Sequence, residues 1–113
     1  MAAASKSELT SLEGRVIAIA GAAGNVGPAV VGRLAPEGAR LCLCGRERSK
    51  LEAVVADTGA DADVDLVDLL DADATKTCAQ ELASRHGGVD ALVHLVGGWR
   101  GGLAYSNVLA GMI

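Results

Sequence analysis

The stretch RVIAIAGAAGNVG, residues 15–27, decides the fold. Its first half is a short apolar run that stops at a glycine, as a buried strand of a parallel sheet does. Three glycines then follow at regular spacing, Gly21, Gly24 and Gly27, and Pro28 stands where the first turn of a helix would begin. The stretch therefore predicts a strand, a glycine-rich turn and a helix in direct succession.

The same alternation of strand and helix continues to residue 96. Further apolar runs predict three more strands, over residues 39–44, 64–69 and 91–96. Helices are expected between them, one opened by a capping box from Ser49 to Glu52 and one over residues 71–85 with Cys78, Ala79 and Leu82 on its inner face. Such alternation indicates parallel β-α-β units. We expect an α/β, Rossmann-like parallel sheet with flanking helices, truncated after the fourth strand.

The chain divides into three parts on this pattern. These are a loose lead-in (1–14), a dinucleotide-binding Rossmann half (15–100) and an apolar tail that is a candidate for the next helix (101–113). Ending the sheet at the fourth strand would leave a flat apolar edge over residues 91–96, so we expect marginal stability or a homo-oligomer formed through that edge.

Composition excludes several classes of partner. The chain has 10 basic and 14 acidic residues and a net charge of −4, which argues against nucleic acid and anionic membranes. No window reaches the ~20 apolar residues of a membrane span, and residues 1–12 do not resemble a signal peptide. We therefore expect a cytoplasmic protein without a nucleic-acid or membrane partner.

The three cysteines, Cys42, Cys44 and Cys78, are expected to be reduced and buried as small apolar residues. We expect the side chains of Cys42 and Cys44 to point to opposite faces of their strand. No second pair of ligands accompanies them, so we predict no metal site.

The glycine-rich turn stands where a dinucleotide fingerprint must stand, between the first strand and a helix N-terminus. Gly21 would permit a tight turn, Gly24 would let the backbone approach a pyrophosphate, and Gly27 would let the helix pack close to the strand. The helix N-terminus would offer its free N–H groups to the phosphates. The candidate phosphate-binding residues are Gly21, Ala23, Gly24, Asn25, Val26 and Gly27. The alternative is a glycine-rich turn selected only for tight packing.

With these motifs, residues 12–98 resemble the N-terminal half of a short-chain dehydrogenase/reductase. Further cues are Gly45-Arg46 after the second strand, Asp68-Leu69 after the third, and Val96-Gly97-Gly98 after the fourth. The resemblance implies an oxidoreductase that binds NAD or NADP and interconverts small carbonyl and alcohol substrates. It also implies that Asp68 and Leu69 lie beside the adenine, and Val96 and Gly97 beside the nicotinamide ribose.

Two departures from the family accompany the resemblance. The glycine spacing is G-x-x-G-x-x-G, whereas core members have G-x-x-x-G-x-G. His94-Leu95-Val96-Gly97 stands where the family usually has Asn-Asn-Ala-Gly. We interpret His94 as a packed core histidine, and His86 as a residue at a helix C-terminus.

Charge favours NADP over NAD as the cofactor. An NAD-binding fold places a carboxylate about 20 residues beyond the glycines, where it accepts the ribose 2′-OH. Here the second strand ends in Gly45-Arg46, and a guanidinium suits a 2′-phosphate. The alternative is a solvated basic turn balanced by Glu47.

The family's catalytic pair, a Tyr with a Lys four positions later, has no counterpart in this sequence. The single tyrosine, Tyr105, is followed four positions later by Leu109. We therefore assign no catalytic residue. Two other interpretations stay open: a non-catalytic dinucleotide-binding module or sensor subunit, and a vestigial or interaction protein without a ligand. Trp99-Arg100 would border a ligand at the sheet edge or anchor a loop.

Overall fold

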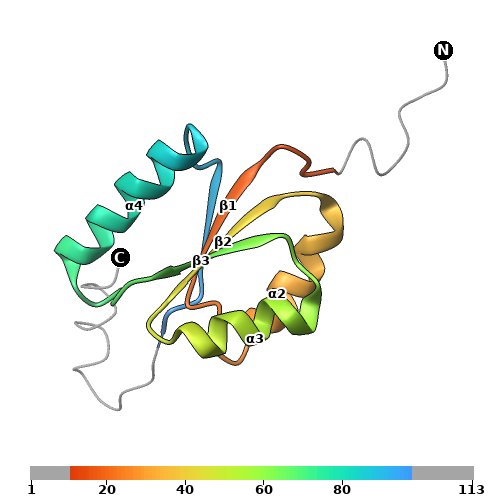
Figure 1. Cartoon of the computed structure of the whole chain (residues 1–113), viewed down its shortest axis with the longest axis horizontal. Coiled ribbons are helices and arrows are strands. Elements are labelled where there is room, and N and C mark those ends of the chain that lie inside the picture. Colours follow the sequence, from red (N-terminus) through yellow and green to blue (C-terminus); the bar gives the residue numbers. More distant parts are fainter. Residues whose placement is uncertain (1–10, 98–113) are drawn as a thin grey trace, which may run out of the picture.

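The computed structural model describes residues 11–97, which form one parallel sheet with helices on both faces (Figure 1). The strands are β1 (Val16–Ala20), β2 (Arg40–Gly45), β3 (Ala62–Leu66) and β4 (Ala91–His94). Their order in the sheet is β3-β2-β1-β4, and every adjacent pair is parallel. The Rossmann-like arrangement expected from the sequence is thus confirmed over these residues.

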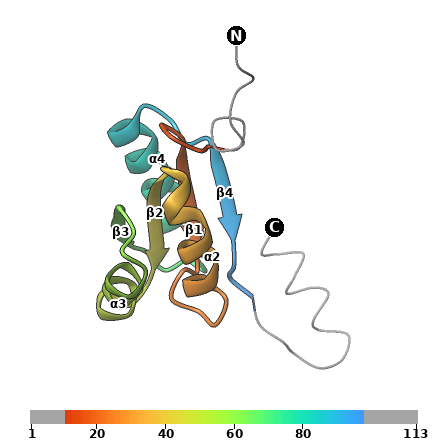
Figure 2. The ribbon, with the colours of Figure 1, turned by 90° about the vertical axis from the view of Figure 1, so that its right-hand side faces the viewer.

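Three α-helices and one 3-10 turn connect the strands. They are α2 (Gly27–Leu34), η1 (Ala35–Glu37), α3 (Arg48–Thr58) and α4 (Ala72–His86). Helices α2 and α3 cover one face of the sheet, and α4 covers the other (Figure 2). None of the helices in this part of the chain is long and apolar enough to cross a membrane.

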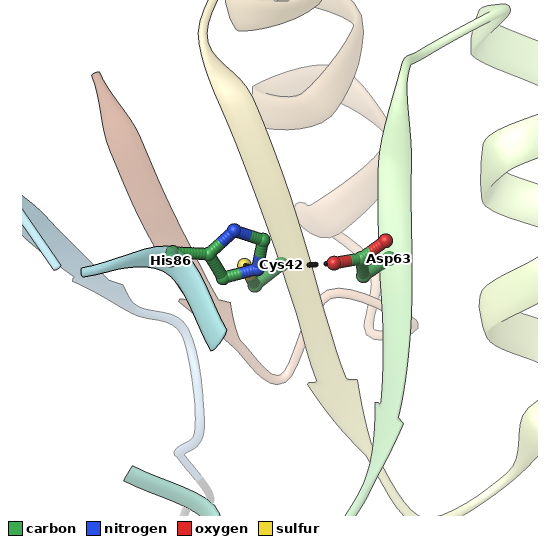
Figure 3. A group of neighbouring side chains, drawn as sticks. All are labelled: Cys42, Asp63 and His86. Carbon is green, nitrogen blue, oxygen red and sulfur yellow. Dashed lines mark hydrogen bonds and ion pairs between the residues drawn. The ribbon is translucent and has the colours of Figure 1, made fainter. Parts of the chain in front are cut away.

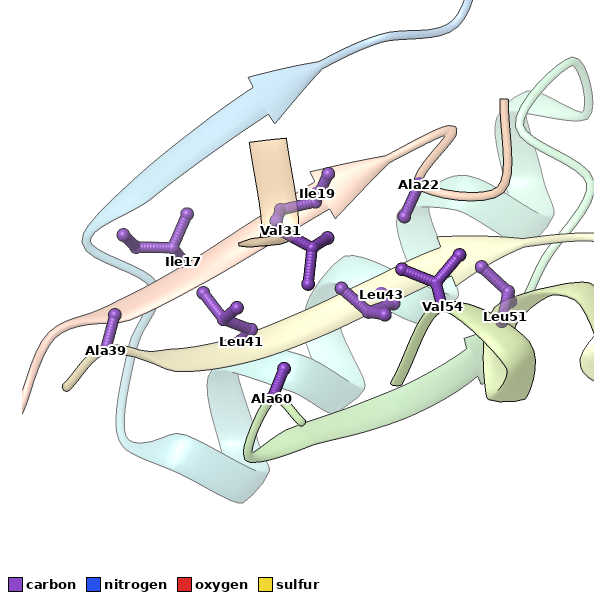
Figure 4. Close-up of a cluster of buried hydrophobic side chains, with 10 residues drawn as sticks. All are labelled: Ile17, Ile19, Ala22, Val31, Ala39, Leu41, Leu43, Leu51, Val54 and Ala60. Carbon is purple, nitrogen blue, oxygen red and sulfur yellow. The ribbon is translucent and has the colours of Figure 1, made fainter. Parts of the chain in front are cut away.

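The two inner strands, β1 and β2, supply both halves of the core. Their side chains alternate between the two faces. Ile19, Leu41 and Leu43 are fully buried against α2 and α3 (Figure 4). Val16 and Ala18 face α4 instead, together with both Cys42 and Cys44. The expectation that these two cysteines point to opposite faces is wrong, because residues two positions apart in a strand share a face.

Two details of the expected helices also differ. Helix α3 begins at Arg48, after an extended Glu47, so Ser49 is already inside the first turn and no capping box forms. Helix α4 begins after Asp71, whose carboxylate accepts from the N–H of Ala74 at 3.0 Å.

The buried stripe of α4 follows the four-residue spacing of a helix face. Leu82 is buried, and Ala74 and Cys78 pack partly against the same cluster. Ala79 is exposed. Its predicted place on the inner face is therefore wrong.

Part of the predicted lead-in is attached to the folded unit. The N–H of Leu12 donates to the carbonyl of Glu37 at 2.9 Å, and the N–H of Arg15 donates to the carbonyl of Leu12 at 2.9 Å. Residues 11–14 are therefore not loose. The apolar tail and Trp99-Arg100 lie outside the described residues.

Candidate nucleotide-binding site

The loop between β1 and α2 is a chain of tight turns anchored to the neighbouring strand. The N–H of Gly21 donates to the carbonyl of Cys44, at the end of β2, at 2.9 Å. The N–H of Gly24 donates to the carbonyl of Gly21 at 3.1 Å, and that of Gly27 to the carbonyl of Gly24 at 3.2 Å. Gly24 and Gly27 thus each close one turn on the preceding glycine, and Gly21 ties the start of the loop to β2, which together fix the path of the loop.

The three glycines meet three different steric demands. Gly21 has a φ of +80°, a left-handed conformation that side chains rarely adopt. A Cβ on Gly27 would stand 1.7 Å from the carbonyl oxygen of Ala22, so α2 can start this close to β1 only with glycine there. A Cβ on Gly24 would stand 3.3 Å from the carbonyl oxygen of Gly21, and Gly24 is exposed. The roles predicted for Gly21 and Gly27 in the turn and in packing match this geometry.

Among the described residues, the N-terminus of α2 has neither a side-chain cap nor an acidic residue in its first turn. Its N-cap residue is Val26. Within residues 11–97, the N–H groups of Asn25 and Val26 have no backbone acceptor. Gly24, Asn25 and Val26 are all exposed. An exposed helix N-terminus with free N–H groups can receive an anion such as a phosphate.

Arg46 follows β2 at the same edge of the sheet and is exposed. Its neighbours are paired with each other: Lys50 with Glu47 at 3.3 Å, and Arg48 with Glu52 at 3.6 Å. Over the described residues no ion pair includes Arg46. Glu47 therefore serves Lys50 and does not balance Arg46, as the alternative interpretation of this turn required.

Asp68 and Leu69 follow β3. The Asp68 carboxylate accepts from the N–H of Leu70 at 3.0 Å, and its carbonyl accepts from the N–H of Asp71 at 2.9 Å. Asp68 is exposed, whereas Leu69 packs partly against the α4 face of the sheet. The turn after β3 lies beside β2, because the N–H of Val67 donates to the carbonyl of Gly45 at 2.8 Å.

Val96 follows β4 and lies against the glycine-rich loop. A Cβ on Gly21 would stand 3.0 Å from both the amide nitrogen and the Cγ2 atom of Val96. Gly97 is exposed, and a Cβ on it would meet no atom of residues 11–97 within 4 Å. Sequence reasoning missed the contact between Gly21 and Val96, because 75 positions separate the two residues. Glycine is thus required at position 21 for two reasons: its φ is positive, and Val96 after β4 leaves little room for a side chain.

All the predicted site residues follow the carboxyl ends of the four parallel strands, which meet at one edge of the sheet. Ligands of open α/β sheets bind at this edge. His94, at the end of β4, is exposed over the described part of the chain. The interpretation of His94 as a packed core residue is therefore wrong there.

Comparison with known proteins identifies the family to which this fold belongs. Residues 15–108 match the family described as short chain dehydrogenase, and the chain belongs to that family. It is 29% identical over 108 residues to dehydrogenase/reductase SDR family member 7B of Danio rerio, covering 87% of this chain and 35% of that protein.

Comparison with solved structures gives the same family. A variant of a Serratia marcescens short-chain dehydrogenase/reductase superposes with a TM-score of 0.71 at 29% identity, over 83% of this chain and 40% of that one. A variant of the actinorhodin polyketide ketoreductase with NADPH superposes with a TM-score of 0.69 at 27% identity, over 80% of this chain and 36% of that one. The chain therefore spans less than half the length of these proteins.

Proposed function

We propose that this chain binds NADP(H) as the cofactor half of a short-chain oxidoreductase that interconverts carbonyls and alcohols. The observation that carries the proposal is the uncapped N-terminus of α2 behind a glycine turn whose Gly27 position admits no Cβ. Such a turn leaves backbone N–H groups and a positive helix end facing solvent, which suits a pyrophosphate. A bound NADP(H) would supply or accept a hydride.

Each strand end would hold one part of the dinucleotide. The loop after β1 would receive the pyrophosphate, and Arg46 would pair with the 2′-phosphate, since no carboxylate of the described chain neutralises it. We expect the turn after β3 to contact the adenine and the turn after β4 to contact the nicotinamide ribose. The residues proposed for these contacts are Gly21, Ala23, Gly24, Asn25, Val26, Gly27, Arg46, Asp68, Leu69, Val96 and Gly97.

The proposal assigns binding and orientation to these residues, and no proton transfer. The family's proton-transferring tyrosine needs a lysine four positions later, and the 113 residues contain no such pair. Reduction of a small carbonyl would need groups that these residues do not carry. We accordingly propose nucleotide binding without turnover for this chain alone. The reducing cytoplasm is the compartment we propose, because Cys42, Cys44 and Cys78 are free thiols.

Thermal unfolding with and without nucleotide tests the proposal. NADPH at about 100 times its Kd should add about 2.7 kcal/mol to the free energy of unfolding. That corresponds to a rise in Tm on the order of 10 to 20 °C for a domain of this size. NADH should give a smaller rise at the same concentration.

Two variants separate phosphate binding from general stability. Gly24→Val should abolish the rise in Tm, because its side chain would occupy the exposed turn that the phosphates approach. Gly32→Ala, in α2 and away from the loop, should retain it. An identical Tm with and without either nucleotide would refute nucleotide binding. It would favour the alternative interpretation, a vestigial or interaction protein without a ligand. Multiple turnovers of a carbonyl substrate by the purified chain would refute the proposal that this chain alone binds nucleotide without turnover.

A further inference from the structure

A second group of chemically capable side chains lies on the α4 face of the sheet (Figure 3). Cys42 of β2 and Asp63 of β3 are direct register partners, so their side chains lie next to each other on one face. His86 is the last residue of α4 and reaches down to them. Its Nε2 atom lies 3.5 Å from the Cys42 Sγ atom and 3.0 Å from the Asp63 Oδ2 atom.

The geometry does not fit a nucleophile activated by a histidine. In a catalytic triad the nucleophile and the carboxylate bind opposite nitrogens of the imidazole ring. Here Sγ and Oδ2 both approach Nε2, so the three donor atoms converge on one point. Burial, and then the nearby charges of Asp63 and Asp65, also raise the pKa of the Cys42 thiol to about 11. Cys42 is therefore not a preformed thiolate, and it is closed to solvent.

Convergence of a sulfur, an imidazole nitrogen and a carboxylate oxygen is what a zinc ion requires. We propose that Cys42, Asp63 and His86 form a zinc-binding site, with water as the fourth ligand. Tetrahedral zinc with bonds of about 2.3 Å to sulfur and about 2.0–2.2 Å to nitrogen and oxygen places its donors roughly 3.3 to 3.6 Å apart. The three donor atoms already lie within 4.8 Å of one another, so small side-chain movements would complete the arrangement.

The surrounding charges hold Asp63 in position and leave one of its oxygens for the ion. Its Oδ1 atom accepts from Arg40, which also pairs with Asp61. Its Oδ2 atom faces His86 and has a longer contact, 3.3 Å, with Arg85. Arg85 has a closer partner in Asp65, at 2.9 Å. Arg85 could therefore leave Oδ2 to a metal ion without losing its own ion pair.

One buried oxygen next to the cluster strengthens the case for a cation. The Oδ2 atom of Asp65 is buried and has no hydrogen-bond partner among the described residues. Asp65 pairs with Cys44 in the register, two residues along the strands from the pair formed by Cys42 and Asp63 and therefore on the same face. The Arg85 guanidinium pairs with the other oxygen, Oδ1, at 2.9 Å, and an unpartnered oxygen on a buried carboxylate stays costly unless further positive charge is near. A zinc ion would supply that charge and deprotonate Cys42 on binding.

The consequence would be a firm attachment of α4 to the sheet. Leu82 is the one buried residue of α4 among those that the structure describes, so the apolar contact of this helix with the sheet is small. An ion that binds His86 together with two strands would tie the end of the helix to β2 and β3. Zinc should therefore raise the Tm of the chain without any nucleotide.

Cobalt provides a direct probe of the three donors. The full, untagged 113-residue chain, treated with a chelator, would be titrated with Co²⁺ and then with Zn²⁺. We expect a thiolate-to-cobalt charge-transfer band that saturates at one ion per chain and disappears as zinc displaces cobalt. Cys42→Ala and His86→Gln should each lose the band. Cys78→Ala removes a thiol from the same face and His94→Gln removes the other histidine, and both controls should retain it.

His86→Gln is the decisive variant if Cys42→Ala does not fold, because His86 stands at the end of a helix. Circular dichroism would show that this variant keeps its secondary structure. Absence of a charge-transfer band in the wild-type chain would overturn the proposal. So would a band that survives His86→Gln, or one that is lost with Cys78→Ala.

Discussion

A methyl group added at Gly27 would stand 1.7 Å from the carbonyl oxygen of Ala22 and 2.4 Å from its carbonyl carbon. Both atoms belong to the backbone and cannot rotate away. The start of α2 would have to move from the end of β1 by more than about 1 Å to reach the 3.0 Å that real Cβ atoms keep. Overpacking of this kind costs about 1 to 3 kcal/mol, and a backbone obstacle places Gly27→Ala at the upper end. Each kcal/mol corresponds to roughly 4 to 8 °C, so the expected fall in Tm is about 10 to 20 °C.

The assay is thermal unfolding by circular dichroism without nucleotide, with Gly32→Ala as the matched control. This control adds the same methyl group to the same helix, where its nearest neighbour would be the Thr58 Cγ2 atom at 3.7 Å. Alanine is favoured over glycine in a helix by about 0.5–1 kcal/mol, so the control should melt a few degrees above the wild type. If Gly27→Ala melts at or above the wild-type temperature, the close contact between α2 and β1 does not exist in solution.

Three further predictions address the cofactor, a helix cap and alkaline pH. Arg46→Asp should shift the preference from NADPH toward NADH, measured as the ratio of the two Kd values, while Arg33→Asp should leave it unchanged; an unchanged ratio in both would refute the 2′-phosphate assignment. Asp71→Ala should cost about 1 kcal/mol of unfolding free energy in urea melts through loss of the α4 cap, and Asp73→Ala much less; equal losses would contradict the capping role. Burial raises the pKa of Cys44 to about 12, so the folded state retains a proton that the unfolded thiol releases, and stability should fall as the pH rises from 9.0 toward 12. Urea melts across that range should show a shallower fall for Cys44→Ala; an equal fall would mean that another group is responsible.

The order of strands and helices could be predicted from the sequence because β1 and β2 are buried on both faces. Strands of this kind produce continuous apolar runs, and each run ends at a glycine that marks a turn. The ends of the outer elements were harder to place. The third strand was predicted over residues 64–69 but runs from Ala62 to Leu66, because its alternating aspartates lie on a face that the pattern treats as solvent.

The glycine-rich loop was also foreseeable, since its residues are contiguous and each steric role is local. The contact of Val96 with Gly21 was not, because it depends on β4 pairing with β1. The group formed by Cys42, Asp63 and His86 was invisible for a similar reason. It requires the register of β2 with β3 and the length of α4, neither of which sequence spacing encodes.

The ion pairs on β3 also determine the direction in which the sheet can grow. β3 is the outer strand on one side, and its Asp63 and Asp65 carboxylates point into the face shared with α4, where Arg40 and Arg85 hold them. Inward-pointing charges on an outer strand oppose the addition of another strand, because the newcomer would disturb these pairs. The outer strand on the opposite side, β4, has no acidic or basic side chain other than His94. Among the described strands, β3 thus carries charges that oppose a further strand, and β4 is the outer strand where an added strand would meet no such ion pairs.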